Sequence, residues 1–291
     1  MDLASLQVFL TVAEEKSFSR AAEKLYRTQP AVSISVRKLE DWVGQPLFVR
    51  GSRSGQLTEA GILLKEYAER MLNLREEIRR GVEDLQKLRQ GEISIGVNES
   101  SIHALLPSLA RYRRKYPKIH VRIHRAFSRD VPGEIVNYRH DFGVVTFRPL
   151  DPNLIAVEFL RDDLTLVVPP RHRLARRRTV DVKDLGGETF IAHIVESPYR
   201  SRVMQLFARY HVPLHMDVEM PTIESIKRFV EMHMGVAIVP RMCVEMEIAQ
   251  GTLIELRIRQ MRIPRHLFLL YRRDRALSHA ARAFMRVLRT R

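Results

Sequence analysis

The stretch that decides the fold lies near the N-terminus, where residues 17–44 read SFSRAAEKLYRTQPAVSISVRKLEDWVG. We expect a short helix to begin near Ser19 as its N-cap and to bury two small alanines, over which another helix can cross closely. Thr28 is suited to cap a second, longer helix, because Pro30 then falls in the first turn, where its missing N–H costs nothing. Gly44 ends this helix. The spacing therefore predicts two helices joined by a tight turn.

The longer helix has two chemically different faces. Its apolar face is a stripe at helical spacing that consists of Val32, Val36, Leu39 and Val43. Its opposite face presents Gln29, Ser33, Ile34, Arg37 and Lys38. A short helix, a turn and a longer helix with polar outward residues are typical of a helix-turn-helix that enters the major groove of DNA. An exposed basic face is also ordinary on a three-helix bundle, so this pattern alone leaves both interpretations open.

The flanking segments complete a small domain. Upstream, apolar residues at helical spacing from Leu3 to Ala13 predict an amphipathic helix. Downstream, residues 46–50 and 56–58 are short extended segments around the Gly- and Ser-rich stretch 51–55. This pattern predicts a hairpin with a flexible basic tip. Residues 1–58 are therefore expected to form an all-α winged helix-turn-helix domain.

These residues also carry a family resemblance. The matching motifs are Phe9-x-x-Val12-Ala13-Glu14, Ser17-Phe18-Ser19-x-Ala21-Ala22, Gln29-Pro30-Ala31-Val32-Ser33, Pro46-Leu47-Phe48-x-Arg50 and Leu57-Thr58-x-Ala60-Gly61. Together they closely resemble the signature of LysR-type transcriptional regulators, and the resemblance implies double-stranded DNA as a partner. The sequence departs from the family at Ile34, where Arg or Lys is frequent. An isoleucine cannot hydrogen-bond guanine, but it can touch a thymine methyl group.

Side-chain chemistry divides the expected DNA contacts into two kinds. We assign base edges to Gln29, Ser33, Ile34 and Arg37, with Pro30 as an apolar contact beside them. We assign phosphates, or the minor groove at the wing tip, to Lys38, Arg50, Arg53 and Thr58, and we place Ser19 on the same DNA-facing surface.

The charge of the chain is unevenly distributed. Its formal net charge is +15, of which residues 91–291 carry +13 and residues 1–90 only +2. Between Lys16 and Arg53, however, eight basic and three acidic residues give a local charge of +5. This local excess, rather than the charge of the whole chain, is what contact with phosphates requires.

Residues 59–90 predict one long helix, since they contain no proline. Apolar residues recur at alternating steps of three and four, the a/d rule of a coiled coil: Leu64, Tyr67, Met71, Leu74, Ile78, Leu85 and Leu88, with Gly81 interrupting the seam. A helix buried on its own domain is the alternative interpretation. The seam favours a linker helix that pairs with a second copy of the chain, and a two-fold homodimer implies an inverted-repeat operator.

From Gly91 onward, strand and helix patterns alternate, which predicts a parallel α/β sheet with right-handed crossovers. The segments Leu106-Pro107, Tyr116-Pro117, Val168-Pro169-Pro170 and Gly235-Val236-Ala237-Ile238-Val239-Pro240 resemble the effector-binding domain of the LysR family, which is similar to periplasmic solute-binding proteins. The resemblance implies two subdomains, the first of about residues 91–160 plus 266–291 and the second of about residues 161–265. It also implies chain crossings near Leu160 and Arg265 and a final helix, Ser278 to Leu288, that returns to the first subdomain.

In such open sheets, ligands bind at the carboxyl ends of strands and against helix N-termini. The residues at these positions are Ser100, Ser101, Thr146, Ser197 and Thr222, which offer hydroxyls, and Arg148, Arg200 and Arg202, which offer positive charge. They predict a small anionic effector. Each hydroxyl could equally be a helix cap and each arginine a solvated charge, and the sequence leaves that choice open.

Motifs of other functions do not occur in the sequence. There is no G-x-S-x-G, G-x-G-x-x-G or P-loop motif, and the histidines lack cysteines or carboxylates at ligand spacing. We therefore expect no catalytic residues, cofactor or metal. The single cysteine, Cys243, excludes an internal disulfide framework. No apolar run is long enough to cross a bilayer and the N-terminus does not read as a signal peptide, so a cytoplasmic protein without membrane contact is expected.

The sequence thus favours a ligand-responsive transcription factor. A nonspecific architectural DNA-binding protein without ligand response is the alternative, and an enzyme fused to a DNA-binding domain would need a catalytic constellation. The family resemblance adds further expected partners: a second copy of the chain in a homodimer or tetramer, and RNA polymerase.

Overall fold

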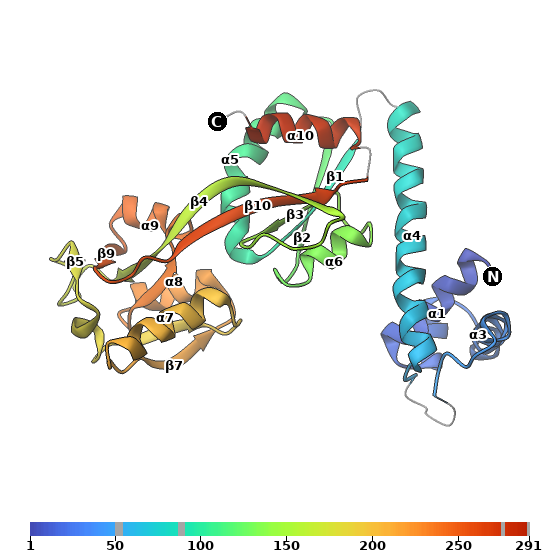
Figure 1. The fold of residues 1–291 in the computed structure, drawn as a ribbon, viewed down its shortest axis with the longest axis horizontal. Coiled ribbons are helices and arrows are strands. Elements are labelled where there is room, and N and C mark those ends of the chain that lie inside the picture. Colours follow the sequence, from blue (N-terminus) through green and yellow to red (C-terminus); the bar gives the residue numbers. More distant parts are fainter. Residues whose placement is uncertain (50–54, 87–90, 275–276, 290–291) are drawn as a thin grey trace.

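The computed structural model describes residues 1–49, 55–86, 91–274 and 277–289. Figure 1 shows three parts in chain order: a helical N-terminal part, the long helix α4 (Glu59–Gln86), and an α/β part that extends away from α4. No helix among the described residues has both the length and the apolarity needed to span a membrane.

The N-terminal part contains the three predicted helices, α1 (Leu3–Glu15), α2 (Phe18–Lys24) and α3 (Gln29–Val43). They share one apolar core, in which Phe9, Ala21 and Val32 are fully buried. α3 ends at Gly44, whose φ of +75° is the left-handed conformation that glycine adopts at little cost. The amphipathic spacing therefore predicted these helices and their buried faces correctly.

The helix caps differ from the prediction. α2 begins at Phe18, and the hydroxyl of Ser17, not of Ser19, accepts a hydrogen bond from the N–H of Arg20 at 3.3 Å. Ser19 lies exposed within the first turn of α2. Thr28 precedes α3 as predicted, but its side chain makes no capping hydrogen bond. Ser17 and Ser19 have the same chemistry, and only the local backbone conformation decides which of them caps the helix.

The predicted hairpin is confirmed at its base. Phe48 and Leu57 form an antiparallel bridge, and the N–H of Val49 donates to the carbonyl of Gln56 at 2.9 Å. The carboxylate of Glu40, near the end of α3, accepts from the N–H of Leu47 at 2.7 Å and ties the start of the hairpin to that helix.

Helix α4 presents apolar residues on two different faces. On one face, Ala68 and Leu72 are buried in the N-terminal core, and Leu64 packs against the same core. The prediction that Leu64 belongs to the exposed seam is therefore wrong. The other face is exposed and is described with the candidate sites below.

The α/β part consists of two groups of elements. The first group is β1 (Glu92–Val97), α5 (Glu99–Lys115), β2 (His120–Arg125), α6 (Val131–Val136) and β3 (Phe142–Val145). The second group is β5 (Thr179–Val180), η1 (Val182–Leu185), β6 (Thr189–His193), α7 (Pro198–Arg209), β7 (His215–Met220), α8 (Ile223–Glu231), β8 (Ala237–Pro240), η2 (Arg241–Cys243), α9 (Glu245–Gln250) and β9 (Ile254–Ile258). The long strands β4 (Leu154–Val168) and β10 (Pro264–Arg272) join the groups, and α10 (His279–Arg289) is the last described helix.

The sheet is mixed, not parallel as predicted. Its strand order is β2-β1-β3-β10-β4-β9-β5, with β8 also paired to β4, while β6 and β7 form a separate parallel pair. β1, β2 and β3 are parallel, whereas β10 is antiparallel to both β3 and β4. Figure 1 shows β4 and β10 running side by side from one group to the other. Leu160 and Arg265, where chain crossings were expected, lie in these two strands.

The first group has helices on both faces of its sheet. On one face, α5 and α10 pack through Tyr112 and Phe284 against Phe142 of β3. On the other face, α6 covers Val145 with Val131. The terminal helix therefore returns to the first group, as the family resemblance implied, and the end of the chain completes a core that begins at β1.

The Phe48 side chain predicts a testable contribution to stability. Its ring lies 5.4 Å from that of Phe9 and 5.2 Å from that of Phe18, and the residue is only 6% exposed. We expect Phe48→Ala to lower the free energy of unfolding by about 3–5 kcal/mol, because it leaves a cavity where the hairpin meets the helices. The matched control is the exposed neighbour Val49→Ala, for which we expect a change within about 0.5 kcal/mol. Urea unfolding measures both, and equal losses would contradict this account.

Candidate DNA-binding surface and ligand cleft

The exposed face of α3 is the surface predicted to contact DNA. Gln29, Pro30, Ile34, Arg37 and Lys38 are exposed, and Ser33 is half-buried among them. The Gln29 amide donates to the Ser33 hydroxyl at 3.1 Å, so these two side chains stand together at the start of the helix. The α-helical period brings all these residues to one side because the opposite stripe is buried.

Of the remaining predicted DNA contacts, Ser19 is exposed in the first turn of α2, and the others fall into two cases. Arg50 and Arg53 lie outside the described residues. Thr58 is part of the local structure: its hydroxyl donates to the carbonyl of Pro46 at 2.7 Å and accepts from the N–H of Gly61 at 3.0 Å. Since its only hydroxyl hydrogen is used within the protein, Thr58 caps α4 and is not placed to donate to a phosphate.

One exposed aromatic residue beside α3 escaped the sequence analysis. Tyr26 is 98% exposed in the turn between α2 and α3, and its φ is +53°, an uncommon conformation for a residue with a side chain. Helical periodicity says nothing about the exposure of a residue in a turn. The helix-turn-helix motif itself, however, places Tyr26 in the turn before the predicted recognition helix, and this position could have identified it.

The exposed face of α4 carries an uninterrupted apolar stripe. Its members step by three or four residues and are Leu63, Tyr67, Met71, Leu74, Ile78 and Val82, each at least 41% exposed. Tyr67, Met71, Leu74 and Ile78 belong to the predicted seam, and Leu63 takes the place assigned to Leu64. The side chain of Leu85 lies outside the described residues.

A cleft of about 310 Å³ lies where the two α/β groups face each other. The first group contributes residues from the start of α5 and from the segments that follow β2 and β3, and the second contributes residues around β6 and at the start of α7. Four of the predicted effector residues line it, namely Ser100, Thr146, Ser197 and Arg200. The rule that ligands bind at strand carboxyl ends and helix N-termini therefore located the cleft.

Four other predicted effector residues do not line the cleft. Ser101 is fully buried on the inner side of α5. Arg148 and Arg202 lie over aromatic rings, those of Phe268 and Tyr199 respectively, at 5.7 and 5.8 Å. The hydroxyl of Thr222 accepts from the N–H of Ser225 and caps α8. Their predicted role in effector binding is not supported, because none of the four belongs to the cleft lining.

Arg265 is the buried cation of the cleft, and the sequence analysis did not assign it this role. It is 2% exposed, and its guanidinium donates to a carboxylate oxygen of Asp162 at 2.6 Å and to the hydroxyl of Ser100 at 3.0 Å. Among the residues that the structure describes, its Nε has no hydrogen-bond partner. The guanidinium also lies 5.2 Å from the ring of Tyr199, whose hydroxyl donates to the carbonyl of Thr146 at 2.9 Å.

Burial affects two titratable groups behind Arg265. It raises the pKa of the Asp162 carboxyl, although Arg265 and the N–H of Met242 oppose that shift. It also raises the pKa of the Cys243 thiol to about 12. The thiol therefore stays protonated near neutral pH, which agrees with its contact to the carbonyl of Ser100 at 3.5 Å.

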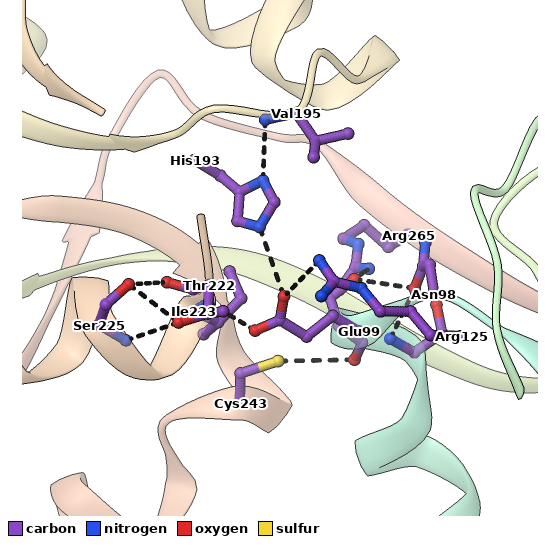
Figure 2. A network of polar contacts seen from close by, with 12 residues as sticks. Asn98, Glu99, Arg125, His193, Val195, Thr222, Ile223, Ser225, Cys243 and Arg265 are labelled. Carbon is purple, nitrogen blue, oxygen red and sulfur yellow. Dashed lines mark hydrogen bonds and ion pairs between the residues drawn. The ribbon is translucent and has the colours of Figure 1, made fainter. Parts of the chain in front are cut away.

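Glu99 lies at the centre of a second polar network, shown in Figure 2. Its Oε1 accepts from the backbone N–H of Ile223 at 2.7 Å, and its Oε2 lies 3.6 Å from Nε2 of His193 and 3.7 Å from a guanidinium nitrogen of Arg125. The N–H of Val195 donates to Nδ1 of His193 at 3.0 Å. The neutral ring consequently carries its hydrogen on Nε2, directed at Glu99.

The lining of the cleft is apolar with an excess of positive charge. Its charged residues are Arg125, Arg129, Arg200 and Arg265 against Glu99 and Glu196, and its aromatic and aliphatic residues include Phe127, Phe147, Phe190, Val203 and Ile238. Such a lining suits a ligand with an apolar body and an anionic group. Within the described ranges, no group of three or more His, Cys, Asp or Glu residues is placed to hold a metal ion.

Comparisons with known proteins cover almost the whole chain. Residues 3–62 match the model "Bacterial regulatory helix-turn-helix protein, lysR family", and residues 86–291 match "LysR substrate binding domain". A probable RuBisCO transcriptional regulator of Trichormus variabilis is 34% identical over 289 residues, which span 97% of this chain and 86% of that protein.

Solved structures share the fold. CbnR, a LysR family transcriptional regulator, has a TM-score of 0.76 at 20% identity, over 99% of this chain and 98% of that chain. The regulatory domain of Synechocystis CcmR, solved in complex with 2-PG, has a TM-score of 0.61 at 24% identity, over 68% of this chain and 96% of that domain.

The two exposed cations of α3 predict different effects on DNA binding. If Arg37 contacts a base edge as predicted, Arg37→Ala should cost about 1–3 kcal/mol of binding free energy and relax preference at one base pair. If Lys38 contacts a phosphate as predicted, Lys38→Ala should weaken binding to all DNA sequences alike and flatten its salt dependence. Fluorescence anisotropy with single-base operator variants over a salt series measures both. Identical selectivity profiles for the two variants would contradict the division of roles.

Proposed function

Because this chain belongs to the LysR family of transcriptional regulators, we propose that it binds an interrupted inverted-repeat operator as a homodimer and that a small anionic effector in its cleft controls this binding. The observation that carries the effector assignment is Arg265, a buried guanidinium in the cleft lining with an unpartnered Nε. A buried donor without a partner costs free energy, and an anionic ligand would remove that cost.

The proposed assembly rests on the exposed stripe of α4. Apolar side chains at a/d spacing on a solvent-facing helix lose unfavourable contact with water when a second copy covers them. A two-fold pair of α4 helices brings two copies of α3 into one particle, and two recognition helices read two half-sites. We propose that residues 59–90 serve as this dimerisation helix between a DNA-binding domain of residues 1–58 and an effector-binding domain of residues 91–291.

The proposed effector is an organic anion of limited size. A cleft of about 310 Å³ suits a small metabolite. The Ser197 hydroxyl lines the cleft beside Arg200 and accepts from the N–H of Arg200 at 3.2 Å, so its own hydrogen can be donated to a carboxylate or phosphate. The structure of CcmR, in which 2-PG is bound, gives a precedent for a small-molecule complex on this fold.

The dimer proposal predicts that a charge in the α4 stripe abolishes assembly. We expect Met71→Asp and Ile78→Asp to convert the protein to a monomer and to weaken operator binding at least tenfold, because a buried unpaired carboxylate is costly at an apolar seam. Lys65→Asp, on the same helix outside the stripe, is the control and should stay dimeric. Sedimentation and operator titration measure these properties, and a dimer that survives both stripe variants would refute the proposal.

The effector proposal predicts stabilisation by anions. In a thermal-shift screen of the full-length protein against small carboxylates, phosphates, neutral compounds and amines, we expect anions to raise the melting temperature. The double variant Arg265→Gln and Asp162→Asn removes the cation without leaving a lone buried charge, and it should lose that response. Stabilisation by neutral or cationic compounds only, or an unchanged response of the double variant, would contradict the assignment.

A further inference from the structure

The Glu99 network connects the two α/β groups across the ligand cleft. Glu99 is the first residue of α5 in the first group, whereas Ile223 and His193 belong to α8 and β6 in the second. The hydrogen bond of 2.7 Å from the Ile223 N–H to the Glu99 carboxylate therefore joins the two groups (Figure 2). Glu99 and Ile223 both belong to the cleft lining, so the bond forms inside the site that a ligand would enter.

The groups around this carboxylate are those that would bind a ligand anion. The backbone N–H at the start of the nine-residue helix α8, the Nε2–H of His193 and the guanidinium of Arg125 all converge on Glu99. Arg265, whose buried Nε has no hydrogen-bond partner among the described residues, also lines the cleft and independently supports an anionic ligand here. The donors at Glu99 thus form a second anion-binding position, filled by the protein's own side chain.

We propose that Glu99 is an internal competitor of the effector: its carboxylate fills an anion-binding position of the cleft and links the two α/β groups until the anionic group of the effector displaces it. This inference rests on the proposed function, because it assumes an anionic effector in the same cleft. It adds a specificity rule, namely that the effector needs an anionic group able to take over the Ile223 N–H, His193 and Arg125.

The strength of the contacts suits a displaceable link. Among the described contacts of Glu99, the bond to Ile223 is the short one. Its Oε2 stays 3.6 Å from His193 and 3.7 Å from Arg125, and no described residue forms a direct hydrogen bond with it. The Arg125 side chain is 65% exposed, so water and salt screen its attraction to the carboxylate. A ligand anion that approaches these donors more closely replaces weak contacts with stronger ones.

Competition of this kind has a measurable consequence. An occupied site lowers the apparent affinity of any ligand that needs the same donors, by the fraction of molecules in which the site is free. The negative charge of Glu99 also repels an incoming anion that approaches the same donors. Neutralising Glu99 should therefore tighten anion binding, whereas the loss of a purely structural residue would weaken it.

The test uses the full-length protein and inorganic phosphate as the probe. We expect Glu99→Gln to bind phosphate at least tenfold more tightly than the unmodified protein in isothermal titration, because the repulsion is lost. The control is Glu196→Gln, which removes an exposed carboxylate at the same cleft and should change phosphate affinity less than threefold. Equal or weaker phosphate binding by Glu99→Gln, including no detectable binding in either form, would overturn the proposal.

A ligand-free measurement tests the link itself. In hydrogen exchange, the Ile223 amide should be protected in the unmodified protein and in Glu99→Gln, whose side-chain oxygen still accepts, and should exchange much faster in Glu99→Ala. Equal exchange in all three forms would show that the link does not exist. Failure of the proposed function is recognised separately, as loss of all stabilisation by anions in the screen of carboxylates and phosphates while the protection of Ile223 persists.

Discussion

The pairing of β4 with β10 is the constraint on which the α/β part depends. Asp162 and Arg265 face each other in the register of these strands, and both are almost fully withdrawn from water. Removing one partner of such a pair typically costs about 3–5 kcal/mol, because an uncompensated charge remains buried. The ion pair therefore fixes the register at the place where the strands leave one group and enter the other. Arg265 is also the residue that extends from this pair into the cleft.

The contacts of Ser100 explain why the cleft forms where it does. Its hydroxyl accepts from Arg265 of β10, and its carbonyl contacts the thiol of Cys243 in η2. The start of α5 is thereby joined to a connecting strand and to the second group. The positions of Ser100 and Glu99 are local consequences of the strand-to-helix turn after β1, where the side chain of Asn98 caps α5 by accepting from the N–H of Ser101.

Local patterns in the sequence were sufficient to predict helices, but not to predict which residues contact each other in the folded chain. The helices of the N-terminal part follow from apolar spacing, because burial on one face of a helix has a period of 3.6 residues. The same spacing could not decide whether Leu63 or Leu64 belongs to the exposed face of α4. That helix has two apolar faces, and only the folded chain shows that Leu64 and Ala68 lie on the face that packs against the N-terminal core. Serine and threonine hydroxyls at helix starts predicted residues of the cleft lining. Ser101, however, is buried, and Thr222 caps α8. Arg265 lies 165 residues from Ser100 in the chain, and no local pattern indicates such a contact.

A signal from the cleft to DNA has to pass from the α/β part to α4, and a hydrogen bond between two described residues lies on that route. The side-chain amide of Asn73, on α4, donates to the carbonyl of Asn137 at the end of α6 at 2.9 Å. α6 packs on β3, and Thr146 of the cleft lining directly follows that strand. Opposite charges act beside this hydrogen bond: Glu77 of α4 attracts Arg272 of β10, and Arg70 of α4 attracts Asp274. These contacts join α4 to the sheet that borders the cleft. A ligand that alters the groups around β3 can therefore shift the orientation of α4, to the extent that it binds one arrangement more tightly than the other.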